Sequence, residues 1–245
     1  YDIAAANIAL VRDAIVGWTG AYVFADRDEN RILASETPIR AQSISKSVTA
    51  WGVMRLVEQG RLGLDAPVSN YLTALEPLDL GSLTNAVTIR QLLSHTGGLP
   101  LGDVFTIYAP GEPMPSLEEK LAGDIGLAHA PGSRFAYSNT GYHLLEWLIE
   151  KQTGLGFSDF MEREILAPLG MKHSTFDADP RLAVNWPVGY TLRGRPVPPY
   201  VYPEKASGGL ITTAADIAAF AIAGMKDAPS GRRSVPPARG CLQSG

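Results

Sequence analysis

The chain has 245 residues, enough for one large domain or two interleaved lobes with a buried core. Hydrophobic residues make up 45% of the chain and charged residues 19%. The net charge is -4, and the only basic run is the pair Arg232 and Arg233, so nothing indicates binding to nucleic acid or to an anionic membrane. Cys241, the single cysteine, excludes an internal disulfide and a cysteine-based metal cluster, and no apolar run approaches the roughly 18 residues of a membrane span.

The N-terminal part is predicted to contain two helices separated by extended segments. Residues 3–18 combine good helix formers with helix-like apolar spacing. Residues 20–28 are predicted to form a short strand, and residues 31–40 an extended segment. From Ser43 the apolar pattern becomes helical again, and Gly60 is a natural C-terminal cap for that helix.

The middle of the chain is predicted to be mainly helical. Thr88 can cap a short helix, and Ser116 begins a capping-box sequence three residues before a glutamate. Residues 139–154 give the clearest amphipathic helix, and residues 157–170 give another. Thr213 then opens a last helix through a second capping box.

These elements suggest a helical lobe inserted into a mixed α/β lobe. We assign the α/β lobe to residues 1–60 and 196–225, and the mainly helical lobe to residues 61–195. Residues 180–204 carry much of the proline and are expected to form a long loop with edge strands. Residues 226–245 lack periodic apolar content and are expected to be irregular or disordered.

The sequence Ser43-Ile44-Ser45-Lys46 places a lysine three residues after a serine at a predicted helix start. Residues three apart share one face of a helix, so Lys46 can hydrogen-bond Ser43. Burial and the helix N-terminus both lower a lysine pKa, which allows Lys46 to accept the serine proton. The alternative is a serine-rich helix start with an exposed lysine, because so short a motif also occurs by chance.

A second polar group, Tyr137-Ser138-Asn139, precedes the clearest helix. Tyr137 could relay a proton between Ser43, Lys46 and a leaving group. The Asn139 amide could fix Lys46 and a substrate carbonyl. The alternatives are a half-buried loop aromatic for Tyr137 and a simple N-cap for Asn139.

Other catalytic classes find less support in the sequence. A nucleophile elbow of the G-x-S-x-G type is not present. The four histidines are scattered without metal-ligand spacing, so we expect no metal. His143 is expected to be a surface or packed histidine, and His173 a structural one.

Taken together, Ser43-Ile44-Ser45-Lys46 and Tyr137-Ser138-Asn139 resemble the paired motifs of the serine β-lactamase and penicillin-binding-protein superfamily, most closely its class C β-lactamase and family VIII esterase branch. Further stretches resemble that branch in the family's order, and together they span roughly residues 36–222: residues 37–72, 87–100, 131–154, 165–176 and 206–220.

The resemblance implies a β-lactamase/transpeptidase-like α/β (α+β) fold, in which a mixed antiparallel-sheet lobe and a helical lobe enclose the site. It also implies acyl-serine chemistry without metal or cofactor. Ser43 would be the nucleophile, Lys46 and Tyr137 the acid/base pair, and Asn139 a substrate-positioning residue.

The implied substrate is a small molecule or a peptide: a β-lactam, a D-amino-acid peptide or a small ester. A general hydrolase is favoured over a dedicated β-lactamase. The alternative is an inactive relative that only binds peptidoglycan-like or peptide ligands. By the same resemblance a periplasmic or secreted location is expected, and the chain starts at Tyr1, which fits a removed signal peptide or a trimmed chain.

One motif of the family has no counterpart in the expected place. The family carries a Lys/His-Thr/Ser-Gly triplet on a late strand that lines the site, and nothing after Met225 fits it. His95-Thr96-Gly97 has the right residue types, but it precedes Tyr137 and is interpreted as a structural turn. We therefore expect an incomplete sheet, in a chain that is truncated, frame-shifted or completed by a partner.

Overall fold

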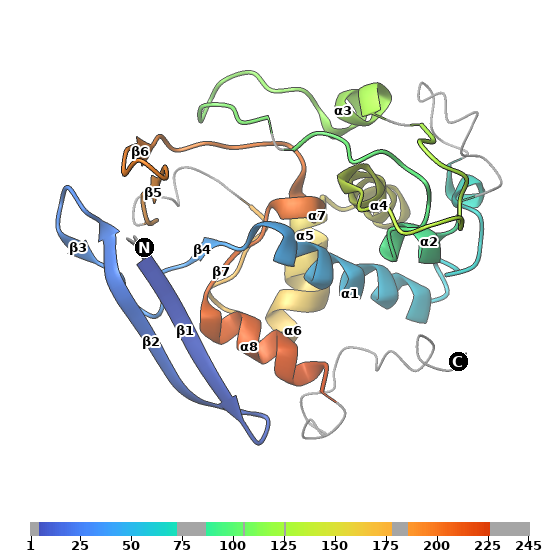
Figure 1. Cartoon of the computed structure of the whole chain (residues 1–245). Coiled ribbons are helices and arrows are strands. Elements are labelled where there is room, and N and C mark those ends of the chain that lie inside the picture. Colours follow the sequence, from blue (N-terminus) through green and yellow to red (C-terminus); the bar gives the residue numbers. More distant parts are fainter. Residues whose placement is uncertain (1–4, 73–86, 105, 125, 178–185, 226–245) are drawn as a thin grey trace.

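A computed structural model describes residues 5–72, 87–104, 106–124, 126–177 and 186–225 (Figure 1). The chain forms a mixed α/β fold, as expected, with helices and small antiparallel sheets. The predicted irregular tail, Cys241 and the region searched for the third motif lie outside the described residues. The lobe boundaries at residues 60 and 195 stay a prediction.

The N-terminal segment forms a β-hairpin, so the helix predicted over residues 3–18 is wrong. β1 (Ala5–Arg12) pairs antiparallel with β2 (Ile15–Asp26), and β2 pairs with the short β3 (Arg31–Ile32). The two turn residues, Asp13 and Ala14, have φ values of 51° and 55°. Positive φ at both central residues is typical of the tight hairpin turn whose twist matches paired strands.

The two faces of this hairpin differ in exposure. α8 (Ala214–Ala223) packs along β1 and β2, beside the hairpin in Figure 1. The other face exposes apolar side chains. On it, Leu10 lies opposite Trp18 in the register and Ala6 lies opposite Tyr22. Apolar residues lie on both faces of β1, and only Asn7 and Arg12 are polar, which conceals the alternation that would have indicated a strand.

The helix predicted from Ser43 forms, but it begins with a tighter turn. The 3₁₀ turn η1 (Gln42–Ile44) leads into α1 (Ser45–Glu58). Directly before η1, β4 (Ile39–Arg40) pairs antiparallel with β7 (Ile211–Thr212), which joins residues far apart in the sequence.

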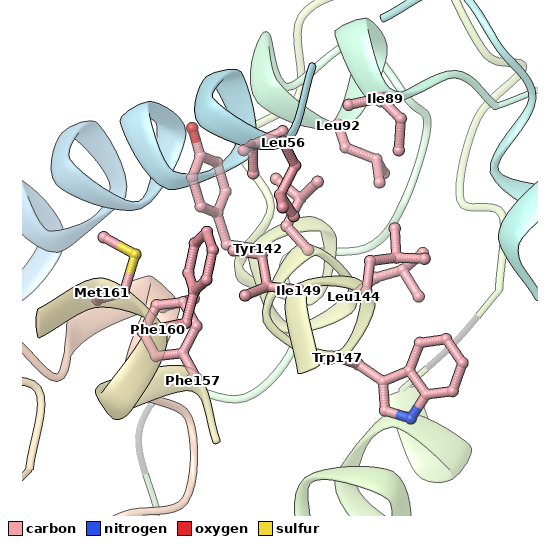
Figure 2. Packing of buried hydrophobic residues seen from close by; sticks show 14 of the residues in the cluster. Leu56, Ile89, Leu92, Tyr142, Leu144, Trp147, Ile149, Phe157, Phe160 and Met161 are labelled. Carbon is pink, nitrogen blue, oxygen red and sulfur yellow. The ribbon is translucent and has the colours of Figure 1, made fainter. Parts of the chain in front are cut away.

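α4 (Asn139–Thr153) is the central helix of the body. The Ser138 side chain caps its start by accepting a hydrogen bond from the Gly141 N–H, and Gly154 ends it with a φ of 70°. Every residue from Asn139 to Ile149 is buried, so the helix is covered on all sides. Figure 2 shows side chains of α1, α2 and α5 converging on it: Leu56, Ile89, Leu92, Phe157, Phe160 and Met161.

Three of the shorter helices, α2 (Ile89–Leu93), α3 (Leu117–Asp124) and α8, begin at the predicted caps. Thr88 and Gln91 form a reciprocal capping box, and Ser116 and Glu119 form another. Thr213 caps α8 by accepting from the Asp216 N–H. α2, α3 and α5 (Phe157–Met161) contact α4 directly. The other short elements of this part are η2 (Val68–Tyr71), the π-helical turn η3 (Glu162–Leu166) and α6 (Ala167–Leu169).

Between α6 and α8 the chain crosses back to α1. The predicted edge strands appear as a small hairpin of β5 (Gly189–Tyr190) and β6 (Pro196–Val197). The one-turn helix α7 (Lys205–Gly208) then packs on α1 and α4. Gly209 follows it so closely that an added Cβ would lie 2.7 Å from the Lys205 Cα, so this position requires glycine.

Candidate active site

Ser43 lies in the η1 turn at the N-terminal end of α1, with its side chain exposed. Gln42, the residue before it, has a φ of 48°, which is uncommon for a residue other than glycine. Strained backbone of this kind concentrates at functional sites. The turn presents Ser43 on the surface while the residues that follow descend into the body.

Lys46 is buried, with 5% of its surface exposed, so the alternative of an exposed lysine is wrong. Its Nζ lies 3.4 Å from Ser43 Oγ and donates to the Ser207 carbonyl at 2.6 Å. Burial has the largest influence on the Lys46 pKa and lowers it, while Tyr137 opposes the shift. The sequence thus folds so that a lysine held below its usual pKa lies next to an exposed serine.

Tyr137 approaches Ser43 from the loop before α4. Its hydroxyl donates to Ser43 Oγ at 3.0 Å, although the two residues are 94 positions apart. The Tyr137 ring lies 5.0 Å from Lys46 Nζ, measured to the ring centroid. Ser43, Lys46 and Tyr137 are therefore brought together, as the motifs predicted.

His95 packs against the ring of Tyr137. The two rings are stacked with centroids 4.4 Å apart, and His95 Nδ1 accepts a hydrogen bond from the Ser138 N–H at 3.2 Å. His95 has a φ of 58° in a turn after α2, which confirms the interpretation of His95-Thr96-Gly97 as a structural turn. Burial lowers the pKa of His95, and the nearby Lys46 charge lowers it further.

Asn139 lies at the start of α4, but its predicted contact with Lys46 does not form. Its Nδ2 donates to the Asp103 carbonyl at 3.0 Å, and its Oδ1 accepts no hydrogen bond from the residues that the structure describes. Ser138, not Asn139, is the N-cap. The amide is therefore held by the loop before α3 instead of the lysine.

The segment around α7 completes the surroundings of Lys46, and the motifs gave no sign of this role. Thr49 Oγ1 donates to the Ala206 carbonyl at 3.0 Å, and Ser45 Oγ accepts from the Leu210 N–H at 2.9 Å. Together with the bond from Lys46 to Ser207, three side chains of α1 bind three residues of this segment. The signal that could have found it is the stretch 206–220, which resembles the family but contains no titratable site residue in its first half.

Two buried side chains of α4 face the same segment. His143 Nε2 lies 2.9 Å from Ser207 Oγ, and burial lowers the pKa of His143 to about 3. Glu146 Oε2 accepts from the Ala206 N–H at 2.7 Å, and burial raises the pKa of Glu146 to about 8. His143 is therefore a packed histidine, which was one of the two roles expected for it.

An apolar cavity of about 530 Å³ is lined by β4 and by residues 186–201, and no residue of the η1 turn lines it. Arg40 and Tyr200 both line it, and Gln42 Nε2 donates to the Tyr200 hydroxyl at 3.5 Å. The Arg40 guanidinium lies over the Tyr200 ring, 4.3 Å from its centroid. A cavity of this size matches the volumes of ordinary small-molecule sites.

Within the described ranges, no group of three His, Cys, Asp or Glu side chains is placed to hold a metal ion. None of the helices in those ranges is both long and apolar enough to cross a bilayer. The chemistry that the site itself offers is proton transfer: one exposed hydroxyl lies within reach of a buried amine and a phenol.

The chain is similar to known proteins over most of its length. The family model described as Beta-lactamase matches residues 1–239. Protein flp of Staphylococcus aureus (strain MW2) is 29% identical over 194 residues, which cover 78% of this chain and 39% of that protein.

Two solved structures resemble the whole described fold. The octameric penicillin-binding protein homologue from Pyrococcus abyssi has a TM-score of 0.79 at 29% identity, covering 95% of this chain and 55% of that one. The D-alanine carboxypeptidase AmpC from Burkholderia cenocepacia has a TM-score of 0.76 at 27% identity, covering 96% and 64% respectively. The chain thus spans about two fifths of its curated relative and under two thirds of both structures.

Proposed function

The chain belongs to the beta-lactamase family, and from this premise we propose that it is a serine hydrolase that acts through an acyl-enzyme on amide or ester bonds. Ser43 is the nucleophile, and Lys46 and Tyr137 are its acid/base pair. The observation that carries the proposal is the convergence on Ser43 Oγ, with the Tyr137 hydroxyl at 3.0 Å and Lys46 Nζ at 3.4 Å. Both distances suit a proton that moves as the nucleophile attacks.

The proposed acylation involves three proton transfers. As Ser43 Oγ bonds to the substrate carbonyl carbon, its proton passes to the neutral Lys46 amine, and the carbonyl oxygen becomes an oxyanion. When the oxyanion collapses, the bond to the leaving group breaks and Tyr137 gives that group a proton. The Lys46 ammonium restores the proton to Tyr137, and water later hydrolyses the acyl-serine with the same groups in reverse.

The lowered pKa of Lys46 supports its role as the base. An ordinary lysine holds its proton at neutral pH, so only a small fraction of it could accept one. Burial shifts the Lys46 pKa downward and enlarges that fraction. The acylation rate is therefore expected to rise with pH until the Lys46 pKa is passed.

Among the possible substrates we favour a small ester or a D-amino-acid peptide over a β-lactam. The apolar cavity lined by Arg40, three residues before Ser43 in the chain, could take an acyl group with apolar surface, and Arg40 at its wall suits a substrate carboxylate. The similarity to a protein described as a D-alanine carboxypeptidase points the same way. Asn139 is assigned to substrate positioning by the family resemblance; its buried Oδ1 accepts no hydrogen bond from the other described groups.

Covalent labelling tests the proposal. Purified protein is incubated with a fluorescent fluorophosphonate or a fluorescent penicillin, and the intact mass is measured. Wild type and Ser94→Ala should gain the mass of one probe, while Ser43→Ala should gain none. Ser94 is a matched control, because it is an exposed serine at the end of α2.

The result also separates the hydrolase from a relative that only binds its ligand. Wild type that gains no mass from either probe would contradict the proposal. Binding of a peptidoglycan-like peptide without a covalent adduct would then favour the binding-only alternative. Labelling that persists in Ser43→Ala would assign the nucleophile to another residue.

A further inference from the structure

α4 directs two buried polar side chains at the segment that receives the Lys46 amine. His143 and Glu146 are three residues apart, so they share one face of the helix. Glu146 accepts a hydrogen bond from the Ala206 N–H, and Thr49 of α1 donates one to the Ala206 carbonyl. The next residue, Ser207, is held through its side chain by His143, at 2.9 Å.

His143 is fully buried and remains a neutral imidazole. Burial and the charges of Lys46 and Lys120 all disfavour a second proton on its ring and lower its pKa. Among the described groups, Nδ1 has no hydrogen-bond partner. A buried N–H without an acceptor is rarer than a buried lone pair without a donor, so the ring proton belongs on Nε2. In that tautomer Nε2–H donates to Ser207 Oγ.

The Ser207 carbonyl determines where the Lys46 amine points. Nζ donates to this carbonyl at 2.6 Å, whereas it lies 3.4 Å from Ser43 Oγ. A neutral amine has one lone pair, and fixing one of its N–H groups on the carbonyl limits the directions that the lone pair can take. A displacement of about 1 Å in such a group can cost about 100-fold in rate.

We infer that His143 is a positioning residue, which acts through Ser207 to hold the carbonyl that orients Lys46 toward Ser43. This inference rests on the proposed acyl-enzyme chemistry for its rate effect but not for its geometry. His143 does not touch Ser43 in this arrangement, and its effect reaches the hydroxyl through Ser207 and Lys46 in sequence.

A double-mutant cycle measures this coupling. His143→Leu and Ser207→Ala should each slow acylation by a fluorescent fluorophosphonate about 10- to 100-fold. The double variant should be no slower than the slower single variant, because both changes release the same carbonyl. His143→Gln, which keeps an N–H donor, should recover most of the rate. Costs that multiply in the double variant would overturn the inference.

Thr140→Val is the matched control. Thr140 is fully buried on α4, one turn before His143, and its hydroxyl has no partner among the described residues. Its loss should leave the acylation rate unchanged. All variants are first compared by thermal unfolding, and if His143→Leu does not fold, Ser207→Ala and the Gln variant carry the comparison.

A second measurement does not depend on catalysis. In the Ser43→Ala background, the Lys46 side chain is titrated by NMR of 13C-labelled lysine Cε, with the resonance assigned from Lys46→Arg. A fixed carbonyl stabilises the ammonium, so His143→Leu and Ser207→Ala should both move the Lys46 midpoint to lower pH. Midpoints that stay at the parent value would overturn the inference. Failure of wild type to form any adduct would contradict the proposed function, while this titration would still decide the role of His143.

Discussion

The helical body around α4 and the β1–β2 hairpin differ in how far they bury their apolar side chains. Trp147 of α4 is 0% exposed and packs within the core, whereas Trp18 of β2 is 44% exposed on the outer face of the hairpin. The helices around α4 share one buried apolar core, whereas the hairpin covers only the face that meets α8. The residues of the candidate site belong to the helical body, in which Lys46 is buried while Ile44 and Phe135 stay exposed, and the outer face of the hairpin contributes no residue to the site.

The largest expected effect is on the acylation rate, when the proposed base is removed from the helical body. Lys46→Met should slow acylation about 100- to 10,000-fold, because the proposed base for Ser43 is lost while an apolar side chain fills the same space. Stopped-flow labelling with a fluorescent probe measures the rate. Trp18→Thr on the hairpin should keep the wild-type rate. Equal rates for Lys46→Met and wild type would remove Lys46 from the mechanism.

The same substitution in the two regions compares their packing. Trp147→Ala should lower the free energy of unfolding by about 3 to 5 kcal/mol, because it leaves a cavity against α4. Trp18→Ala should cost about 1 kcal/mol or less, because half of its ring already contacts water. Urea denaturation followed by circular dichroism measures both. Similar losses in the two variants would show that the hairpin is packed as tightly as the body.

Glu146 should make the stability of the body depend on pH. Burial raises its pKa from an ordinary value of 4.5 to about 8, so the folded state binds the proton more tightly than the unfolded state. The stabilising contribution is complete below about pH 4.5 and is lost as the pH rises toward 8. Thermal unfolding of Glu146→Gln should show a flatter profile, with an advantage over wild type at pH 8 of roughly 1 to 4 kcal/mol.

That profile is compared with one for an exposed, uncharged residue of the hairpin. Leu10→Thr should change stability by the same amount at pH 5 and at pH 8, because it removes no titratable group. If wild type and Glu146→Gln keep a constant difference across this range, the proton on Glu146 does not contribute to folding.

The smallest expected effect concerns the outer face of the hairpin. Leu10→Thr combined with Trp18→Thr replaces two exposed side chains that lie opposite each other in the register. Threonine favours strands, so stability should change by less than about 1 kcal/mol. Binding of the dye ANS and self-association in sedimentation velocity should both decrease. A large cooperative loss of stability would mean that this face is buried in solution.

The two regions also differ in how well the sequence predicted them. Caps at Thr88, Ser116 and Thr213 gave the starts of α2, α3 and α8, because a cap is a local interaction that leaves a fixed spacing. The hairpin was missed because its turn, Asp13-Ala14, lacks the glycine that usually marks such turns. Alanine and leucine in β1 also favour a helix, and only pairing with β2 overrides that preference.

For the site, the sequence indicated which residues meet but not what holds them. The grouping of Ser43, Lys46 and Tyr137 followed from two motifs and the family resemblance. The predicted bond between Asn139 and Lys46 does not form: the Asn139 Nδ2 donates to the Asp103 carbonyl, and Lys46 donates to the Ser207 carbonyl instead. Ser207 was missed, since it binds Lys46 through a backbone carbonyl, a group that every residue has and no sequence pattern marks.

The bond from Lys46 to the Ser207 carbonyl joins positions 161 residues apart. Contacts of such long sequence separation carry a large loop-closure cost and are expected to form late in folding. Substitutions at Ser207 should therefore speed unfolding and leave the folding rate nearly unchanged, the behaviour of a region with low φ-values. The base of the proposed nucleophile would then be put in place by one of the last steps of folding, so partly folded chains would present Ser43 without its activating lysine.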